Sequence, residues 1–293
     1  MTMMHITKPN FAKPCCPFIK WVGGKRGLLS QILPLFPSEF ENYHEPFLGG
    51  GAVFFELYNK GLLKDKNIFL SDINDELINA YLQVKENPTK LISELKKYKQ
   101  NHSKDFYYHT RSLDREVNFK KTSPLKRAAR FIYLNKTCFN GLYRVNAKGY
   151  FNVPMGSYKN PNIADEDAIY HASEALQNAT IKCQSFTNVL NDTKSGDFIY
   201  FDPPYYPLTP TANFTAYSQD GFLEAEQIKL FEVFRELNDS GCKVAQSNSD
   251  TEFIKEMYKD FEINIVMMNR FINSNKYGRG KVKETLIKNY DFV

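Results

Sequence analysis

One stretch of the chain, residues 198–205, constrains the fold more than any other. It reads F-I-Y-F-D-P-P-Y, an apolar run typical of a buried strand that ends in Asp202, Pro203, Pro204 and Tyr205. Proline has no N–H, so the two prolines give the strand a rigid end that offers carbonyl acceptors and no donors. An ionised Asp202 also only accepts hydrogen bonds. This edge suits an amino group on a flat ring, although an isolated D-P-P equally fits a stiff loop with packed tyrosines.

Strand-like and helix-like segments alternate on both sides of this stretch. The expected strands are at 41–45, 67–70, 181–184, 197–201, 242–246, 262–268 and 285–289, and the expected helices outside the middle of the chain are at 52–60, about 75–84, 223–237 and 251–258. Such alternation predicts an α/β fold with a mostly parallel, doubly wound sheet. Ligands of these sheets bind beyond the carboxyl ends of the strands, which is where Asp202 is expected.

The middle of the chain, about residues 88–162, has a different character. It is basic, rich in tyrosine and helical in its first part, where Pro124 is a typical first residue of a helix. Residues 146–149 predict a hairpin turn between two short strands. We therefore expect one α/β domain in two parts, residues 1–75 and 166–293, with a mainly helical insert at 76–165 that carries a β-hairpin.

The net charge of +5 is unevenly distributed along the sequence. Residues 90–160 contain 16 Lys and Arg against 4 Asp and Glu, an excess of +12. The rest of the chain contains 22 against 29, an excess of −7. Positive charge concentrated in one segment favours a polyanion as the partner of that segment. A solvated basic helix surface explains the same charge, and composition alone does not separate the two.

A glycine-rich turn and an acid point to a nucleoside. Residues 46–51 read P-F-L-G-G-G between an expected strand and an expected helix, whose first N–H groups are free to bind a ligand. Asp72 ends the next strand, where dinucleotide-binding folds place the acid that binds the ribose hydroxyls. A tight turn and a turn-capping acid explain each feature alone. Together they favour an adenosine-containing cofactor, and the absence of G-x-G-x-x-G disfavours a nicotinamide one.

Several classes of protein are disfavoured. No apolar run approaches the roughly 18–20 residues of a membrane-spanning helix, and the mean hydropathy is −0.47. No secretory signal is visible at the N-terminus. The five cysteines are scattered and include no C-x-x-C, so neither a disulfide framework nor a zinc site is indicated. We expect free thiols, a cytoplasmic location, no membrane partner and no metal.

The motifs, in this order, resemble those of the Dam-type DNA adenine N6-methyltransferases, the D12 or alpha class. The matching segments are F-I-K-W-V-G-G-K (18–25), E-P-F-L-G-G-G (45–51), S-D-I-N (71–74), N-G-L-Y-R-V-N (140–146), F-N-V-P (151–154), D-P-P-Y (202–205), the loop at 207–215 and R-G-K (279–281). The resemblance extends from about Phe18 to Asn289 and is greatest for members that modify GATC. It implies a Rossmann-like methyltransferase sheet with an inserted DNA-recognition domain.

The resemblance also implies roles for individual residues. The set implied to bind S-adenosylmethionine is Trp21, Lys25, Phe47, Gly49, Gly51, Asp72, Phe186 and Asp202. The set implied to contact double-stranded DNA is Lys20, Phe139, Asn140, Leu142, Arg144, Pro154 and Tyr158. The catalytic motif is Asp202, Pro203, Pro204 and Tyr205. Arg144 matches the arginine that recognises a guanine edge, while Phe139 and Leu142 equally fit core positions.

Some questions stay open at this level. Gln184 and Ser185 are uncharged where part of the family has an acid, which puts a contact with the cofactor's adenine amine in doubt. A methyltransferase acting on cytosine N4, on an RNA base or on a glutamine amide is one alternative. A non-catalytic DNA-binding regulator that keeps the fold is another. The sequence decides neither between monomer and dimer nor between a solitary enzyme and the partner of a restriction endonuclease.

Overall fold

The fold is built on one sheet of seven strands. The computed structural model describes residues 14–208, 222–269 and 281–291, so residues 209–215 and 279–280 of the predicted motifs lie outside the described part. The strands are β1 (Tyr43–Glu45), β2 (Ile68–Asp72), β3 (Ala179–Cys183), β4 (Phe198–Phe201), β5 (Lys243–Ser249), β6 (Glu262–Asn269) and β7 (Lys281–Lys288). Their order is β3-β2-β1-β4-β5-β7-β6, and the first five are parallel. The expected α/β class is confirmed.

The last strand of the chain departs from simple alternation. β7 lies between β5 and β6 and is antiparallel to both. It therefore places residue Glu284 opposite Ser249, at the end of β5 that lies beside the carboxyl end of β4. The sequence pattern predicted both strands at the C-terminus but not this order.

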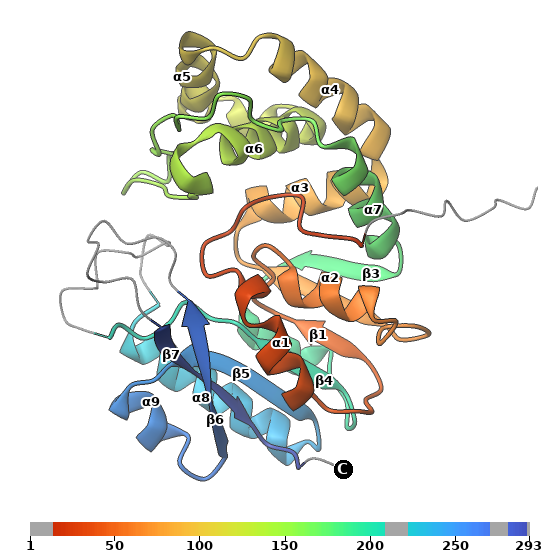
Figure 1. Ribbon diagram of the computed structural model, residues 1–293, viewed down its shortest axis with the longest axis vertical. Helices are drawn as coiled ribbons and strands as arrows, with labels where there is room; N and C mark the ends of the chain where they lie inside the picture. Colours follow the sequence, from red (N-terminus) through yellow and green to blue (C-terminus); the bar gives the residue numbers. More distant parts are fainter. Residues whose placement is uncertain (1–13, 209–221, 270–280, 292–293) are drawn as a thin grey trace, which may run out of the picture.

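Helices flank the sheet and form a separate group above it (Figure 1). The helices are α1 (Leu29–Ile32), α2 (Ala52–Asn59), α3 (Asp75–Glu86), α4 (Pro88–Gln100), α5 (Lys104–Ser112), α6 (Pro124–Thr137), α7 (Glu166–Leu176), α8 (Glu224–Asp239) and α9 (Glu252–Met257). Side-chain caps begin several of them: Asn74 accepts from the N–H of Leu77 and Thr251 from that of Ile254. In the described residues, no helix is long and apolar enough to cross a membrane.

Successive side chains of β4 point to opposite faces of the sheet, as the strand period requires. Phe198 and Tyr200 belong to the larger buried cluster, which also contains residues of α3 and α6. Ile199 and Phe201 belong to a second cluster, with residues of α8 and α9. All four side chains are buried, so β4 is covered on both faces and its carboxyl end is the only part that can reach a ligand.

The insert lies in the crossover from β2 to β3, which runs through α3, α4, α5, α6 and α7 (Figure 1). Its apolar residues, such as Tyr107 on α5 and Ile132 on α6, join the same buried cluster as Leu70 of the sheet. The insert thus shares a core with the sheet instead of having its own. We keep the division at 76–165 as a proposal based on topology.

Much of the positive charge of the insert is used inside it. Arg127 binds Glu76 through its Nε and Nη2 atoms, and Lys120 binds the same carboxylate. Arg130 donates to the carbonyls of Thr110 and Arg111 and pairs with Asp114. The charge excess of this segment is therefore partly structural, and exposed cations that have no such partner in the described part of the chain, such as Lys148, are better candidates to meet a polyanion.

Candidate active site

The turn that follows β4 is held by an ion pair with a distant segment. Asp202 is the first residue after the strand, and its Oδ1 lies 2.7 Å from Nζ of Lys25. Lys25 is 3% exposed and also donates to the carbonyl of Gly23 at 2.8 Å. Its ammonium lies 4.7 Å from the ring centre of Tyr205. Lys25 thus links the N-terminal motif to the acid and the aromatic ring of the D-P-P-Y motif.

Burial and charge act in opposite directions on Asp202. Desolvation raises the pKa of its carboxyl above the usual 3.8, the nearby Lys25 ammonium lowers it, and Glu284 raises it. The net direction is upward. Lys25 therefore keeps the carboxylate ionised, and able to accept hydrogen bonds, to a lower pH than burial alone would allow.

The two tyrosines of the turn have different surroundings. The Tyr205 hydroxyl donates to Oε2 of Glu284 at 2.7 Å, so β7 fixes the direction of this ring. The Tyr206 ring stacks on Phe253 of α9, with the centroids 4.4 Å apart. One face of the Tyr206 ring is therefore covered by a side chain of the protein. Tyr205 remains the ring of the motif that can meet a flat substrate.

A second acid, Glu45, is buried beneath the site at the end of β1, with 2% exposure. Its Oε2 accepts the Tyr43 hydroxyl at 2.8 Å. The pKa of Glu45 is raised to about 8, chiefly by desolvation and also by the charge of Asp202, while the Tyr43 hydrogen bond and the Lys25 ammonium lower it. Glu45 is thus largely protonated at neutral pH, which limits the negative charge close to Asp202.

The glycine-rich turn is packed against the protein's own aromatic rings. Gly49 has a φ of +47°, and a Cβ there would lie 2.7 Å from Cδ1 of Trp21. Gly51, the N-cap of α2, has a φ of +67°, and a Cβ there would lie 2.8 Å from the Tyr81 hydroxyl. Both positions thus exclude a side chain on steric and backbone grounds. Trp21 lies directly on the turn that the sequence predicted for the cofactor.

Asp72 ends β2 and closes the same turn. Its Oδ2 accepts the N–H of Gly49 at 3.0 Å and its Oδ1 accepts the N–H of Asn74 at 3.0 Å. The turn-capping role is therefore real. Each carboxylate oxygen can accept a second hydrogen bond, so the same group can also bind a pair of hydroxyls. The next residue, Ile73, is 75% exposed and presents an apolar side chain beside the acid.

Two predicted cofactor aromatics lie against each other. Phe47 of the glycine turn stacks on Phe186, with centroids 5.3 Å apart and planes 23° apart, and Phe222 packs edge-on against both. Phe186 begins η6 (Phe186–Asn191), which Ser185 caps by accepting the N–H of Thr187. The N–H of Gln184 donates to the carbonyl of Asp72. The uncharged Gln184–Ser185 pair thus has backbone and capping partners here.

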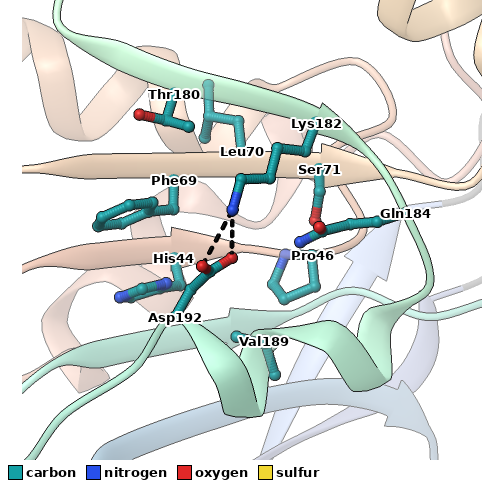
Figure 2. A pocket seen from close by; sticks show the side chains of 10 residues that line it. All are labelled: His44, Pro46, Phe69, Leu70, Ser71, Thr180, Lys182, Gln184, Val189 and Asp192. Atoms are coloured by element: carbon teal, nitrogen blue, oxygen red, sulfur yellow. Dashed lines mark hydrogen bonds and ion pairs between the residues drawn. The ribbon is translucent and has the colours of Figure 1, made fainter.

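Figure 2 shows a small cavity on the face of the sheet that η6 covers. Across it, Lys182 of β3 donates to both carboxylate oxygens of Asp192 at 2.9 and 2.7 Å, and the His44 ring stacks on Phe69. None of the predicted catalytic or cofactor residues lines this cavity. The ion pair joins the edge strand β3 to the end of η6, and we assign this ion pair a structural role.

The cofactor motif and the recognition hairpin are in contact. Trp21 stacks on Tyr143 with the ring centroids 5.7 Å apart, and Phe131 of α6 packs against both rings. Asn135 of α6 accepts the N–H of Lys20 at 2.9 Å and donates to the carbonyls of Lys20 and Gly141. Residues 20–21 are thus joined to the insert through both side chains and backbone.

Some of the predicted DNA-contacting residues are in contact with one another. Lys20 Nζ lies 4.2 Å from the ring centre of Tyr158, and Gly141 is packed against the Lys20 side chain. The Phe139 N–H donates to the carbonyl of Pro154 at 2.9 Å. Phe139 is 50% exposed, which argues against a core position. Leu142, by contrast, is half-buried against the core.

The hairpin is shorter than expected but has the predicted turn. Gly149 donates its N–H to the carbonyl of Asn146, and a single bridge between Val145 and Phe151 replaces the two short strands. Arg144 is exposed, and its Nε donates to Oδ1 of Asn152 at 2.7 Å. This contact orients the guanidinium through Nε, so that the edge with the two terminal nitrogens can meet a planar acceptor pair.

Sequence reasoning missed Glu45, Glu284, Tyr143 and Asn135 as parts of the site. Glu45 and Tyr143 are inside quoted motifs, so their positions carried a signal that was not used. Glu284 and Asn135 reach the site through a strand order and a helix packing that the local pattern does not encode.

Comparison with known proteins agrees with this geometry. The sequence profile of the D12 class N6 adenine-specific DNA methyltransferases matches residues 21–272. The chain is 44% identical to the type II methyltransferase M1.LlaDCHI of Lactococcus lactis subsp. cremoris, over 94% of this chain and 95% of the relative. It is 42% identical to the type II methyltransferase M.MjaIII of Methanocaldococcus jannaschii, over 94% and 99%.

A third relative is a DNA adenine methylase. The DNA adenine methylase of Escherichia coli K12 is 36% identical, with 92% of this chain and 93% of the relative covered. The match therefore includes the glycine turn, the recognition hairpin and the D-P-P-Y motif in one chain of ordinary length for these relatives. The protein belongs to the D12 class of N6 adenine-specific DNA methyltransferases.

Proposed function

We propose that this enzyme transfers a methyl group from S-adenosylmethionine to N6 of the adenine in double-stranded GATC, after extruding the base. The observation that carries the proposal is the Lys25–Asp202 pair at the carboxyl end of β4, on the same sheet edge at which β1 leads into the glycine turn and β2 ends in Asp72. A donor-free edge for an amine and a nucleoside-binding turn are thus joined in one site. Family membership supports adenine over the cytosine, RNA and glutamine alternatives.

The residues at this edge fit S-adenosylmethionine. Asp72 retains acceptor capacity for the ribose hydroxyls, and Ile73 and Phe47 offer apolar surface for the adenine ring. Asp202 lies close enough to Glu284 and to Lys25 for both charges to affect its pKa, while Glu45 is largely protonated. An acid-rich site favours a cation, and the bound cofactor supplies an electrophilic methyl group on a positively charged sulfonium.

Trp21, Gly49, Gly51 and Phe186 complete the proposed cofactor site. The Trp21 indole packs against Gly49 and so supports the conformation of the glycine turn. Phe186 stacks on the Phe47 ring and so fixes its orientation. The roles of Gly49 and Gly51 are to admit these rings and to keep the N-terminus of α2 close to the ligand.

The substrate amine is bound by acceptors. The Asp202 carboxylate accepts one N6 hydrogen and the Pro203 carbonyl accepts the other, which keeps the nitrogen lone pair directed at the methyl group. Lys25 covers one face of Tyr205, so the adenine stacks on the other. Transfer is direct and in line, and the contribution of the protein is mainly alignment.

Recognition is assigned to the insert. The target base must leave the stack, which costs a few kcal/mol, and the exposed Phe139 and Asn140 enter the space next to it. Arg144 forms two hydrogen bonds to a guanine edge, and Leu142 and Pro154 contact a thymine methyl group. Lys20 makes a further base contact, and Tyr158, whose ring centre lies 4.2 Å from the Lys20 ammonium, contacts the DNA beside it.

The test uses duplexes that contain one GATC site. Purified enzyme and tritiated S-adenosylmethionine are incubated with this duplex and with one that carries GTTC instead. The product is then digested with endonucleases that cut only unmethylated or only N6-methylated GATC. Label in the GATC duplex alone, with protection at that site, supports the proposal. Equal label in both duplexes would contradict GATC as the site, and label on cytosine would contradict adenine.

A further inference from the structure

Two buried amide side chains hold the catalytic turn from behind. Gln227 lies on α8 and Asn248 on β5, and both are 0% exposed. Asn248 Nδ2 donates to Gln227 Oε1 at 3.0 Å, and Gln227 Nε2 donates to the carbonyl of Pro204 at 2.9 Å. Asn248 Oδ1 accepts the N–H of Tyr206 at 3.2 Å. The two amides thus bind the backbone on both sides of Tyr205.

The two amides supply hydrogen bonds to a turn whose prolines cannot donate any. Pro203 and Pro204 have no N–H, so the turn cannot be held by donors of its own at these positions. The amides support the turn from the residues that follow, through the carbonyl of Pro204 and the N–H of Tyr206. A buried amide without hydrogen-bond partners destabilises the folded state. The turn provides partners for both Gln227 and Asn248, so the amides and the turn stabilise each other.

The amides also determine which carbonyl faces the substrate. The Pro204 carbonyl is directed into the protein toward Gln227. In the described ranges of the chain, the Pro203 carbonyl accepts no hydrogen bond. The acceptors that remain for an amine with two hydrogens are then the carbonyl of the buried Pro203 and the Asp202 carboxylate, whose Oδ1 also pairs with Lys25.

We infer that Gln227 and Asn248 are positioning residues for methyl transfer: through the backbone of Pro204 and Tyr206, they set where the acceptors for the target amine lie. This inference rests on the proposed function. Alignment errors of about 1 Å can cost on the order of a hundredfold in rate, so a support that touches no substrate still affects turnover. A merely structural role predicts lower stability without a specific effect on turnover.

The decisive variant is Gln227→Glu. Its carboxylate can still accept from Asn248, but it repels the Pro204 carbonyl instead of donating to it. When that carboxyl is protonated, it becomes a donor again, and burial raises its pKa toward the experimental range. We expect kcat at pH 8 to fall at least about tenfold relative to wild type, with KM for DNA and for S-adenosylmethionine within about twofold. The ratio of variant to wild-type kcat should recover as the pH is lowered to 6.

Gln246→Glu is the matched control. Gln246 is also a buried amide of β5, but it accepts from the Tyr258 hydroxyl and does not contact the turn. We expect this change to lower the melting temperature without a pH-dependent recovery of kcat. Gln227→Met, which has no donor in any protonation state, should lose kcat without recovery at pH 6.

The outcomes separate this inference from the proposed function. A duplex with 2-aminopurine in place of the target adenine reports base extrusion by fluorescence, and we expect Gln227→Glu to extrude the base normally. A pH-independent kcat ratio, or full turnover in Gln227→Met, would overturn the positioning role while wild-type methylation still stands. Absence of methyl transfer to GATC by the wild-type enzyme would instead overturn the proposed function.

Discussion

Lys25 and Asp202 come from opposite parts of the sequence and form an ion pair of 2.7 Å at the carboxyl end of β4. The pair joins the N-terminal motif to the catalytic turn. The Lys25 ammonium also lowers the pKa of the Asp202 carboxyl, which burial raises. The same contact therefore serves both the position and the charge of the acceptor.

Replacing Asp202 should stop methyl transfer without preventing DNA binding. Asp202→Ala removes the acceptor and the partner of Lys25, and we expect kcat to fall by about a hundredfold or more. Asp202→Asn keeps one acceptor oxygen and should lose less. Asp250→Ala is the control, because Asp250 follows β5 as Asp202 follows β4 but forms its ion pair with Lys255 of α9. A rate for Asp202→Ala within about tenfold of wild type would exclude the role.

Removing Lys25 should move the acid limb of the pH–rate profile. The ammonium lowers the pKa of Asp202, so Lys25→Met raises that pKa further. As the pH falls, the variant should therefore lose activity about one pH unit or more above the pH at which wild type loses it, because activity needs ionised Asp202. Lys25→Arg keeps the charge and should return the limb toward its wild-type position. If the acid limbs of wild type and Lys25→Met coincide, the Lys25 ammonium does not lower the pKa of Asp202.

Arg144 should determine discrimination at one base pair. Its Nε is bound to Asn152, which presents the two terminal nitrogens for a guanine edge. Arg144→Ala should reduce discrimination at that base pair by about 1–3 kcal/mol, measured as kcat/KM on duplexes with single substitutions in GATC. An equal loss on all duplexes would identify Arg144 as a phosphate contact.

The exposed lysines of the insert should carry the salt dependence of DNA binding. Lys148, at the tip of the hairpin, is exposed, so Lys148→Ala should reduce the slope of log K against log salt by about one if it meets a phosphate. Lys97→Ala is the control, since Lys97 pairs with Glu94 on α4 at the outer edge of the insert (Figure 1). Binding by wild type that does not vary with salt would contradict a polyanion partner for this segment.

Glu45 should make stability fall as the pH rises. Its pKa is about 8 in the folded protein against an ordinary 4.5, so between these values the folded state binds more protons than the unfolded one. The contribution of this group is fully present below about pH 4.5 and is lost progressively up to pH 8, by a few kcal/mol at most. Glu45→Gln removes the titration. Urea unfolding at pH 5.5 and pH 8 should therefore show a smaller loss for Glu45→Gln than for wild type, and equal losses would contradict the raised pKa.

The parts of the site that sequence predicts are those made by neighbours in the chain. The D-P-P-Y turn, the glycine turn and Asp72 each combine a strand end with residues that have few conformations, so the local pattern determines the local structure. The strand ends then meet because parallel strands end at one edge. The expected fold class and family followed from these segments and are confirmed.

The remaining parts depend on packing between distant segments. Glu284 reaches Tyr205 only because β7 enters the sheet between β5 and β6. Arg127 and Arg130 of the insert bind acids and carbonyls within it, although in sequence they are indistinguishable from cations that bind DNA. Gln227 and Asn248 have no motif of their own, because their partners are backbone groups of any residue type.

The strand order has a consequence for synthesis on the ribosome. β1 pairs with β2 on one side and with β4 on the other, and the whole insert is made between those two partners. Lys25 therefore leaves the ribosome long before Asp202, and the Tyr205 ring is made before the Glu284 that binds it. The nascent chain thus has no assembled site until β7 is complete, and a truncated product of translation has the motifs without the activity.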